Sequence, residues 1–436
     1  MKNDTKKFVI NTAFLIITQF FVILLSFIQQ RVFAQNLGAQ YLGLNNLFSN
    51  ILSVLSISEL GLATAFMSSL FEPLRRGNKE TIVQTIVLFR RIYRYIGITI
   101  LTLGSLINVI FIPYYYQLHG LNQSLKLGVL CFYFELYVIN AVLGYFLIYI
   151  RILLIADGNS KIDSLILFGV RITITSLQII MLFVYKSYVI YLLLMILSTL
   201  SYNVIVWFYT SRRYTWLLSS KYAVLKLSDS RFNILRTNIK QNFLIKVSDV
   251  VSKSFDTLFI SISGSLNLIA IYSVNILIVN SILNIFTQLT DIVTSYIGQF
   301  ENGSVNQSKA VKRLEFVFLS LSLVTGSAFN IFLPMFMTLW LNSSYVMDAL
   351  NTALLAILIA IEVFKIFLNG CVNAFGLFEK ISIVDIWKNI ITIVITIVLF
   401  KALSTALFAV VLSCRIFGEL LGVIARYLIV HHKIAN

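Results

Sequence analysis

The sequence predicts an all-α integral membrane protein with about twelve transmembrane helices, arranged as two six-helix lobes around a central cavity. Of its 436 residues, 58% are hydrophobic and only 12% are charged, whereas soluble domains are nearer half apolar and one-quarter charged. The mean hydropathy is +0.89. The apolar runs are also continuous, as in Ile162–Val184, where a membrane barrel would show alternating segments of about ten residues. These observations exclude a water-soluble enzyme.

Twelve apolar runs are long enough for a helix to cross a bilayer, which takes roughly 20 residues. The first run is too long for a signal-peptide core and lacks a small-residue cleavage site, so we expect that nothing is removed. The twelve predicted spans are 10–34, 44–69, 93–115, 125–150, 163–185, 188–210, 242–263, 266–298, 315–341, 347–375, 381–401 and 403–428.

Basic residues alternate between the two sides of these spans. The net charge is +16, from 34 Lys and Arg against 18 Asp and Glu. The ends of the spans are soft, and residues toward them are counted with the adjoining connection. On this count, alternate connections, starting with the N-terminus, hold 25 of the 34; the other connections hold Lys126, Lys186 and Lys401, and six fall within spans. By the positive-inside rule, both termini face the cytoplasm. The basic excess is therefore explained by topology, and we expect no nucleic-acid partner.

The chain divides at its longest polar stretch. We predict an N-terminal six-helix lobe at 1–210, a basic cytoplasmic linker at 211–241 and a C-terminal six-helix lobe at 242–436. A weak repeat supports this division: Phe33–Gly38 closes the first span and Phe259–Gly264 closes the seventh. Because six spans separate the two copies, the repeat is parallel.

Polar residues recur at helical spacing within several spans, where ionisable groups are costly and mark a pathway by default. The seventh span is the richest, and the tenth and twelfth follow the same pattern. Isolated charges also occur at Glu135 and Arg171. The candidate cavity residues for binding a substrate are Arg31, Glu59, Lys246, Asp249, Lys253, Asp256, Asp291, Glu362, Lys365 and Arg415.

Two interpretations of these charges stay open. Neighbours at i+3 or i+4, such as Glu362 with Lys365 and Arg415 with Glu419, could neutralise each other structurally. Alternatively, several polar faces converge on a water-filled cavity, which avoids burying them against lipid. No His lies at membrane depth, so any proton or sodium coupling would have to use carboxylates. We expect no other cofactor.

The mixture of charges and amides suits a ligand that carries both phosphate and sugar hydroxyls. Metal chemistry is not indicated, because the three cysteines sit inside apolar runs and are expected to be buried small residues. These cysteines are Cys131, Cys371 and Cys414.

Short motifs in order along the chain resemble one family of transporters. They are Arg31-Val-Phe with Leu37-Gly38 and Tyr41-Leu-Gly43, Ser58-Glu59-Leu60-Gly61, Leu70-Phe71-Glu72-Pro73-Leu74, Tyr93 with Ile96-Gly97, Leu154-Ile-Ala156-Asp157, Lys246, Asp256-Thr-Leu-Phe-Ile260 with Gly264 and Tyr272, Gly376-Leu-Phe, and Lys388-Asn389. From about Asn11 to Tyr427, the chain resembles the polysaccharide repeat-unit flippases (Wzx type) of the multidrug/oligosaccharidyl-lipid/polysaccharide exporter superfamily.

This resemblance implies a non-enzymatic, multi-pass protein of the bacterial cytoplasmic membrane, without catalytic residues. Such a flippase moves undecaprenyl-pyrophosphate-linked oligosaccharide across the bilayer by alternating access, for capsule, exopolysaccharide or O-antigen assembly. A polysaccharide polymerase and glycosyltransferases are its implied partners. Two departures stand out: Gly158 follows Asp157 where the family often has Gln, and Glu362 with Lys365 match no family pattern.

Three alternative functions stay open on the sequence. A cation-coupled multidrug exporter of the same superfamily would favour a less basic cavity with isolated carboxylates. A membrane-embedded glycosyltransferase or polymerase would be expected to carry acid and base residues on a large external loop, and no external connection exceeds about 15 residues between the predicted spans. A lipid scramblase or assembly partner is compatible with the same sequence.

Overall fold

The computed structural model describes residues 2–56, 62–119, 125–218, 254–300, 305–402 and 407–435. The chain forms two compact units, unit 1 (Met1–Val247) and unit 2 (Ser248–Asn436). All regular secondary structure within the described residues is helical. Most of the predicted linker at 211–241 falls outside the described residues, so the predicted lobe boundaries stay a prediction.

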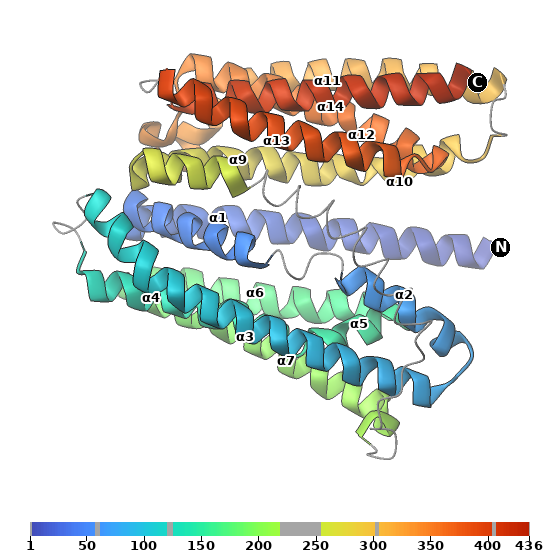
Figure 1. The fold of residues 1–436 in the computed structure, drawn as a ribbon, viewed down its shortest axis with the longest axis horizontal. Coiled ribbons are helices and arrows are strands. Elements are labelled where there is room, and N and C mark those ends of the chain that lie inside the picture. The colour runs from blue at the N-terminus through green and yellow to red at the C-terminus, as the bar shows by residue number, and fades with distance from the viewer. Residues whose placement is uncertain are drawn as a thin grey trace. The chain divides into compact units, whose positions relative to one another are not determined.

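Unit 1 contains seven α-helices within the described residues, and they follow the apolar runs of the sequence. Helix α3 lies along α4, α4 packs on α7, α7 on α6, and α6 on α1 (Figure 1). The helices are α1 (Lys2–Leu55), α2 (Leu62–Arg75), α3 (Lys79–Leu118), α4 (Leu127–Tyr145), α5 (Ile148–Ala156), α6 (Ser160–Tyr185) and α7 (Tyr188–Arg213), followed by the 3-10 turn η3 (Thr215–Leu218).

Helix α1 covers two predicted spans because it is kinked at Gly38. The backbone of Gly38 has φ 83° and ψ 174°, which is not helical. A side chain is strained at a positive φ, so glycine is the residue that permits this break. The first predicted span therefore ends near the kink, and the second begins after it. The remainder of the second span lies at 57–61, outside the described residues, and in the start of α2.

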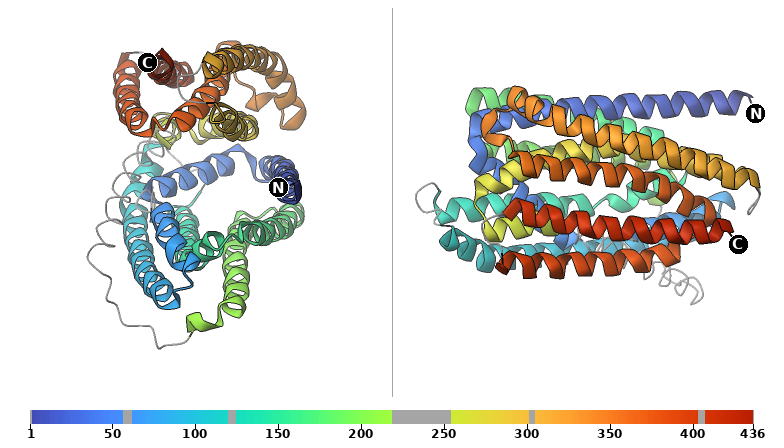
Figure 2. Two further views of the ribbon diagram at one scale, coloured as in Figure 1. Left: turned by 90° about the vertical axis from the view of Figure 1, so that its right-hand side faces the viewer. Right: turned by 90° about the horizontal axis from the view of Figure 1, so that it is seen from above.

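Unit 2 is built around α12. This helix packs against α11, α14, α10 and α9, and 61% of its most apolar stretch is buried. The helices of unit 2 run roughly alongside one another (Figure 2). They are the helical segment 254–263, α9 (Leu266–Thr287), α10 (Leu289–Ile297), α11 (Val305–Trp340), α12 (Ala349–Phe375), α13 (Phe378–Ala402) and α14 (Leu407–Ala435), with a 3-10 turn η5 (Ser343–Tyr345) before α12.

Ten helical stretches in the described part of the chain are long and apolar enough to cross a membrane. One of them, Phe20–Leu55, runs through the kink and so covers two predicted spans. The seventh predicted span is described only at 254–263. Large apolar side chains also point outward, including Val109, Phe316 and Ile331, each exposed by more than two-thirds. Such a surface suits lipid and not water. The predicted all-α, multi-pass membrane protein is confirmed.

Candidate functional site

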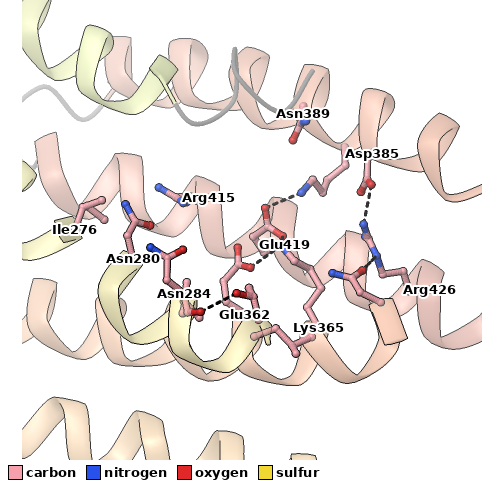
Figure 3. A pocket seen from close by; sticks show the side chains of 15 residues that line it. Ile276, Asn280, Asn284, Glu362, Lys365, Asp385, Asn389, Arg415, Glu419 and Arg426 are labelled. Carbon is pink, nitrogen blue, oxygen red and sulfur yellow. Dashed lines mark hydrogen bonds and ion pairs between the residues drawn. The ribbon is translucent and has the colours of Figure 1, made fainter. Parts of the chain in front are cut away.

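A polar cavity of about 540 Å³ lies within unit 2. Four helices supply its wall, and their polar residues recur at helical spacing, so each helix turns one polar face inward. Figure 3 shows these side chains converging from α9, α12, α13 and α14. The lining residues are Ile276, Asn280, Leu283, Asn284, Thr287, Glu362, Lys365, Ile366, Asn369, Asp385, Lys388, Asn389, Arg415, Glu419 and Arg426.

A chain of four charges crosses the cavity. Glu362 Oε2 lies 2.6 Å from Lys365 Nζ on the same helix, and Lys365 Nζ lies 2.7 Å from Glu419 Oε2 on α14. The other oxygen of Glu419 accepts a hydrogen bond from Lys388 Nζ of α13 at 2.6 Å. Glu419 therefore joins two lysines from two different helices, as Figure 3 shows for Lys365. Buried charges are tolerated when they are paired and hydrogen-bonded in this way.

Glycines on α14 allow the helices to approach closely enough for this chain to form. A Cβ atom built on Gly418 would clash with the side chain of Thr392 on α13. A Cβ on Gly422 would lie 2.9 Å from Cδ of Lys388. Small residues at such crossings are the usual means of close helix packing in membranes. They bring Lys388 within reach of Glu419, one turn from Gly422.

Arg415 forms a second ion pair at the edge of the cavity. Its NH1 donates to Asp256 Oδ2 at 2.9 Å, and the hydroxyl of Tyr272 donates to the same oxygen at 3.1 Å. Asp256 lies on the helical segment 254–263 and is buried, while the Arg415 side chain keeps 19% of its surface exposed. The guanidinium thus contacts Asp256 and also lines the cavity.

Arg426 forms the third cluster. Its NH2 donates to Asp385 Oδ2 at 2.7 Å, and its Nε donates to Asn369 Oδ1 at 2.9 Å. NH1 donates to the carbonyl oxygen of Gly422 at 3.2 Å. With only 5% of its surface exposed, Arg426 cross-links α12, α13 and α14 in the interior.

The charges of this cavity nearly balance. Four cations (Lys365, Lys388, Arg415 and Arg426) and three carboxylates (Glu362, Asp385 and Glu419) line it, and Asp256 behind Arg415 makes the count four against four. Removing one partner from such a buried set leaves an uncompensated charge, which is strongly unfavourable. The cavity can therefore present donors and acceptors in fixed positions to a polar ligand.

The predicted site residues separate into three groups. Asp256, Glu362, Lys365 and Arg415 lie together in unit 2, at or directly behind the cavity wall. Arg31 lies on α1 of unit 1 with its side chain exposed, and it is not among the residues that line the two cavities described in this structure. The predicted residues outside the described part are Glu59, Lys246, Asp249 and Lys253, together with the side chain of Asp291, whose backbone belongs to α10.

The structural pairs proposed from sequence spacing are present in one case and replaced in another. Glu362 does pair with Lys365. Arg415, which by spacing could have neutralised Glu419, instead pairs with Asp256, and Glu419 bonds the two lysines. Pairing across helices takes precedence here because α12, α13 and α14 pack closely enough to place carboxylate and ammonium groups within hydrogen-bond distance.

Sequence reasoning missed Asp385, Lys388 and Arg426 as site residues. Lys388 and Arg426 were counted with the cytoplasmic connections, but both are buried within apolar helices, with 8% and 5% of their surface exposed. The cytoplasmic count therefore falls from 25 to 23, which leaves the predicted orientation unchanged. The spacing of Asp385, Lys388 and Asn389, continued by Thr392 and Thr396, was a one-faced polar pattern that could have identified this helix.

Comparisons with known proteins agree with this architecture at the level of fold. The chain matches no profile of a known protein family and no curated protein sequence. Among solved structures, it is similar to the inward-facing conformation of a multidrug resistance MATE family transporter of the MOP superfamily, with 15% identity and a TM-score of 0.67, covering 96% of this chain and 98% of the other.

Two further structures share the fold. The lipid II flippase MurJ in an inward closed conformation has 14% identity and a TM-score of 0.68, covering 96% of this chain and 87% of MurJ. A MOP superfamily transporter from Pyrococcus furiosus Vc1 (DSM3638), described as having a binding pocket of reverse polarity, has 14% identity and a TM-score of 0.56, covering 98% and 95% of the two chains. The protein thus has the helical fold of MATE and MurJ transporters.

Proposed function

We propose that this protein is a flippase that moves undecaprenyl-pyrophosphate-linked oligosaccharide repeat units across the bacterial cytoplasmic membrane, as the Wzx-type branch of the superfamily does. The observation that carries the proposal is the cavity of unit 2, which lies among apolar helices yet is lined by paired ions and asparagines. A hydrophobic, cationic drug would not need so many fixed hydrogen-bonding groups. An oligosaccharide attached to phosphate has hydroxyl groups and phosphate oxygens that can form hydrogen bonds with them.

The chemistry of the wall fits the two polar parts of such a substrate. Asn280, Asn284 and Asn369 offer amide donors and acceptors for sugar hydroxyls. The carboxylates of Glu362 and Glu419 accept from hydroxyls, and Lys365 and Arg415 donate to sugar or phosphate oxygens. In this proposal, Asp256 holds the Arg415 guanidinium in place through their 2.9 Å contact.

The bridging carboxylate of Glu419 offers a means of changing state. It holds Lys365 and Lys388 together, so an entering anionic group would compete with it for the same donors. Displacing Glu419 from Lys365 and Lys388 would change the contacts between α12, α13 and α14, and alternating access requires helix packing that can switch.

The fold supports a transporter and not a glycosyltransferase or polymerase, because the similar solved structures are transporters and a flippase. MurJ, which is named as a lipid II flippase, supports a lipid-linked substrate by analogy of fold. The bilayer is the environment of this function. A polysaccharide polymerase and glycosyltransferases are the proposed partners on either side of the translocation step.

A multidrug exporter is the second candidate, and one observation favours it. Each cation of the cavity already contacts a carboxylate, so a cationic drug could exchange with a lysine or arginine at these acids. The fold similarity to a MATE transporter is as extensive as that to MurJ.

A deletion strain separates the two functions. Without the flippase, repeat units continue to be made but stay on the inner leaflet, so surface polymer falls and lipid-linked oligosaccharide accumulates. Without a drug exporter, polymer is unchanged and sensitivity to cationic drugs rises. The proposal is wrong if polymer is normal in a strain that has no related gene to compensate.

A further inference from the structure

Unit 1 contains a cavity of its own, of about 320 Å³, between α1, α6 and α7. It is well above the roughly 10–15 Å³ that a single water requires, so it can hold a polar group with its hydration. Gln29, Arg171, Thr175, Gln178, Tyr191 and Ser198 supply polar groups to its wall, and no carboxylate is among the lining residues of this described cavity.

Helix geometry places these side chains on faces that line the same cavity. Arg171, Thr175 and Gln178 are spaced four and three apart on α6, so they share one face. Tyr191 and Ser198 are seven apart on α7, which also puts them on one face. The ring of Tyr191 packs edge-on against Phe33 with centroids 4.8 Å apart, which holds this wall in position.

Arg171 lies near the middle of α6, one of the helices long and apolar enough to cross a membrane, and its side chain is exposed. It is the twelfth residue of α6, about 16 Å from the start of the helix and about 21 Å from its end at 1.5 Å per residue. A side chain at that depth does not easily extend to the headgroups. Ionisable residues in such places face a cavity and a partner, and Arg171 does line a cavity. Within the described residues, no carboxylate forms an ion pair with it.

The two cavities therefore differ in their charge. In unit 2, each cation is within 2.9 Å of a carboxylate, so an anion entering there must displace one. In unit 1, the lining contributes a single positive charge and neutral hydrogen-bonding groups. An anion would meet the exposed guanidinium of Arg171, with which no carboxylate of the described residues is paired, so it would have no acid to displace.

The hydrogen bonds of the wall show which donors can serve an anion. Gln29 Nε2 donates to Gln178 Oε1 at 2.7 Å, and Gln178 Nε2 donates to the carbonyl oxygen of Tyr191 at 3.1 Å. These bonds connect the three helices and fix both amides. The guanidinium of Arg171 and the hydroxyls of Thr175 and Ser198 then supply donors for the oxygens of a ligand.

We propose that the cavity of unit 1 is a binding site for a phosphate or diphosphate group, in which Arg171 donates a forked hydrogen bond and Thr175 and Ser198 donate from its two sides. The diphosphate of a lipid-linked sugar and the phosphate of a bilayer headgroup share this chemistry. We assign the site to the diphosphate, and that assignment of the source rests on the proposed function. Under it, unit 1 offers the diphosphate a site in addition to Lys365 and Arg415 of unit 2.

The test is binding of inorganic pyrophosphate to the purified full-length protein in phosphatidylcholine nanodiscs, by isothermal titration at constant ionic strength. Arg171→Gln is expected to weaken binding about tenfold or more, since a charge-assisted bond is lost. Arg171→Lys keeps the charge without the fork and should retain part of the affinity. Thr175→Val keeps the shape without the hydroxyl and should weaken binding several-fold.

Arg91→Gln is the matched control, because it removes the same charge from an exposed position on α3 that lines neither described cavity. It should bind like the wild type. Equal affinities of wild type, Arg171→Gln and Thr175→Val would overturn the site. If Arg171→Gln does not accumulate, the Thr175→Val and Arg171→Lys measurements decide.

Competition identifies the source of the phosphate. Undecaprenyl diphosphate should displace pyrophosphate at least tenfold better than phosphatidylglycerol does, and equal displacement would overturn the assignment to a diphosphate substrate. Binding and transport are measured separately. A protein that binds pyrophosphate through Arg171 but does not flip lipid-linked sugar would retain the site and refute the proposed function.

Discussion

Replacing Glu419 with glutamine should destabilise unit 2 far more than the loss of an ordinary surface ion pair. In the structure, Glu419 holds Lys365 at 2.7 Å and Lys388 at 2.6 Å. After Glu419→Gln, Lys365 keeps Glu362 at 2.6 Å, whereas Lys388 loses the carboxylate that pairs with it and has only 8% of its surface exposed. One charge is thus left buried and uncompensated.

The expected cost follows from that burial. Removing one partner of a buried pair destabilises by about 3–5 kcal/mol. With about 2–4 °C per kcal/mol for a unit of this size, the midpoint of thermal unfolding should fall by roughly 6–20 °C. The double variant Glu419→Gln/Lys388→Met removes both charges together and should recover most of this loss. Intrinsic tryptophan fluorescence in detergent at a fixed heating rate measures both midpoints.

Glu72→Gln provides the matched control. Glu72 pairs with Arg76 at 2.6 Å, but the two side chains are 56% and 69% exposed. Because exposed pairs are worth at most about 1 kcal/mol, this variant should shift the midpoint only slightly. The reasoning is refuted if Glu419→Gln shifts the midpoint no more than Glu72→Gln, or if the double variant is less stable than Glu419→Gln.

Two further predictions follow from the helices of unit 2. Asn306 lies in the first turn of α11 and Ser343 lies just after its last residue, and the 36 residues of this helix exceed the bilayer core. In a cysteine-free background, an impermeant maleimide on intact cells should label Ser343→Cys and not Asn306→Cys, and the reverse pattern would invert the topology. Gly418→Ala places a methyl group against Thr392 and should cost about 1–3 kcal/mol by overpacking. Recovery in Gly418→Ala/Thr392→Ala, which removes the hydroxyl oxygen that the added methyl group meets first, would identify the clash. An unchanged unfolding midpoint in Gly418→Ala would contradict the close approach of α13 and α14.

The helices were predictable because length and hydropathy alone decide whether a segment can cross a membrane. The long apolar runs of α6, α7 and α12 needed no tertiary information. The kink of α1 was also visible, as a polar break near Gly38 between two runs. Glu362 and Lys365 could be assigned to a polar face because spacing within one helix is fixed by the backbone.

The partners across helices could not be predicted from spacing. Whether Arg415 meets Glu419 or Asp256 depends on the rotation of α14 against its neighbours, which is set by packing. The same packing buries Lys388 deep enough to reach Glu419, with help from Gly422. A lysine within reach of a predicted helix end has the same sequence pattern whether it faces the cytoplasm or a cavity, which is why Lys388 and Arg426 were assigned to the wrong environment.

Flipping by the purified protein tests the central claim most directly. The protein is reconstituted into vesicles with undecaprenyl-pyrophosphate-linked oligosaccharide carrying a labelled sugar, and an impermeant reagent modifies only the glycan on the outer leaflet. With a functional flippase, glycan from the inner leaflet becomes accessible at a rate that rises with protein per vesicle, while labelled phospholipid stays protected. Glycan accessibility no greater than in protein-free vesicles, in preparations that do transport a cationic drug, would contradict the account.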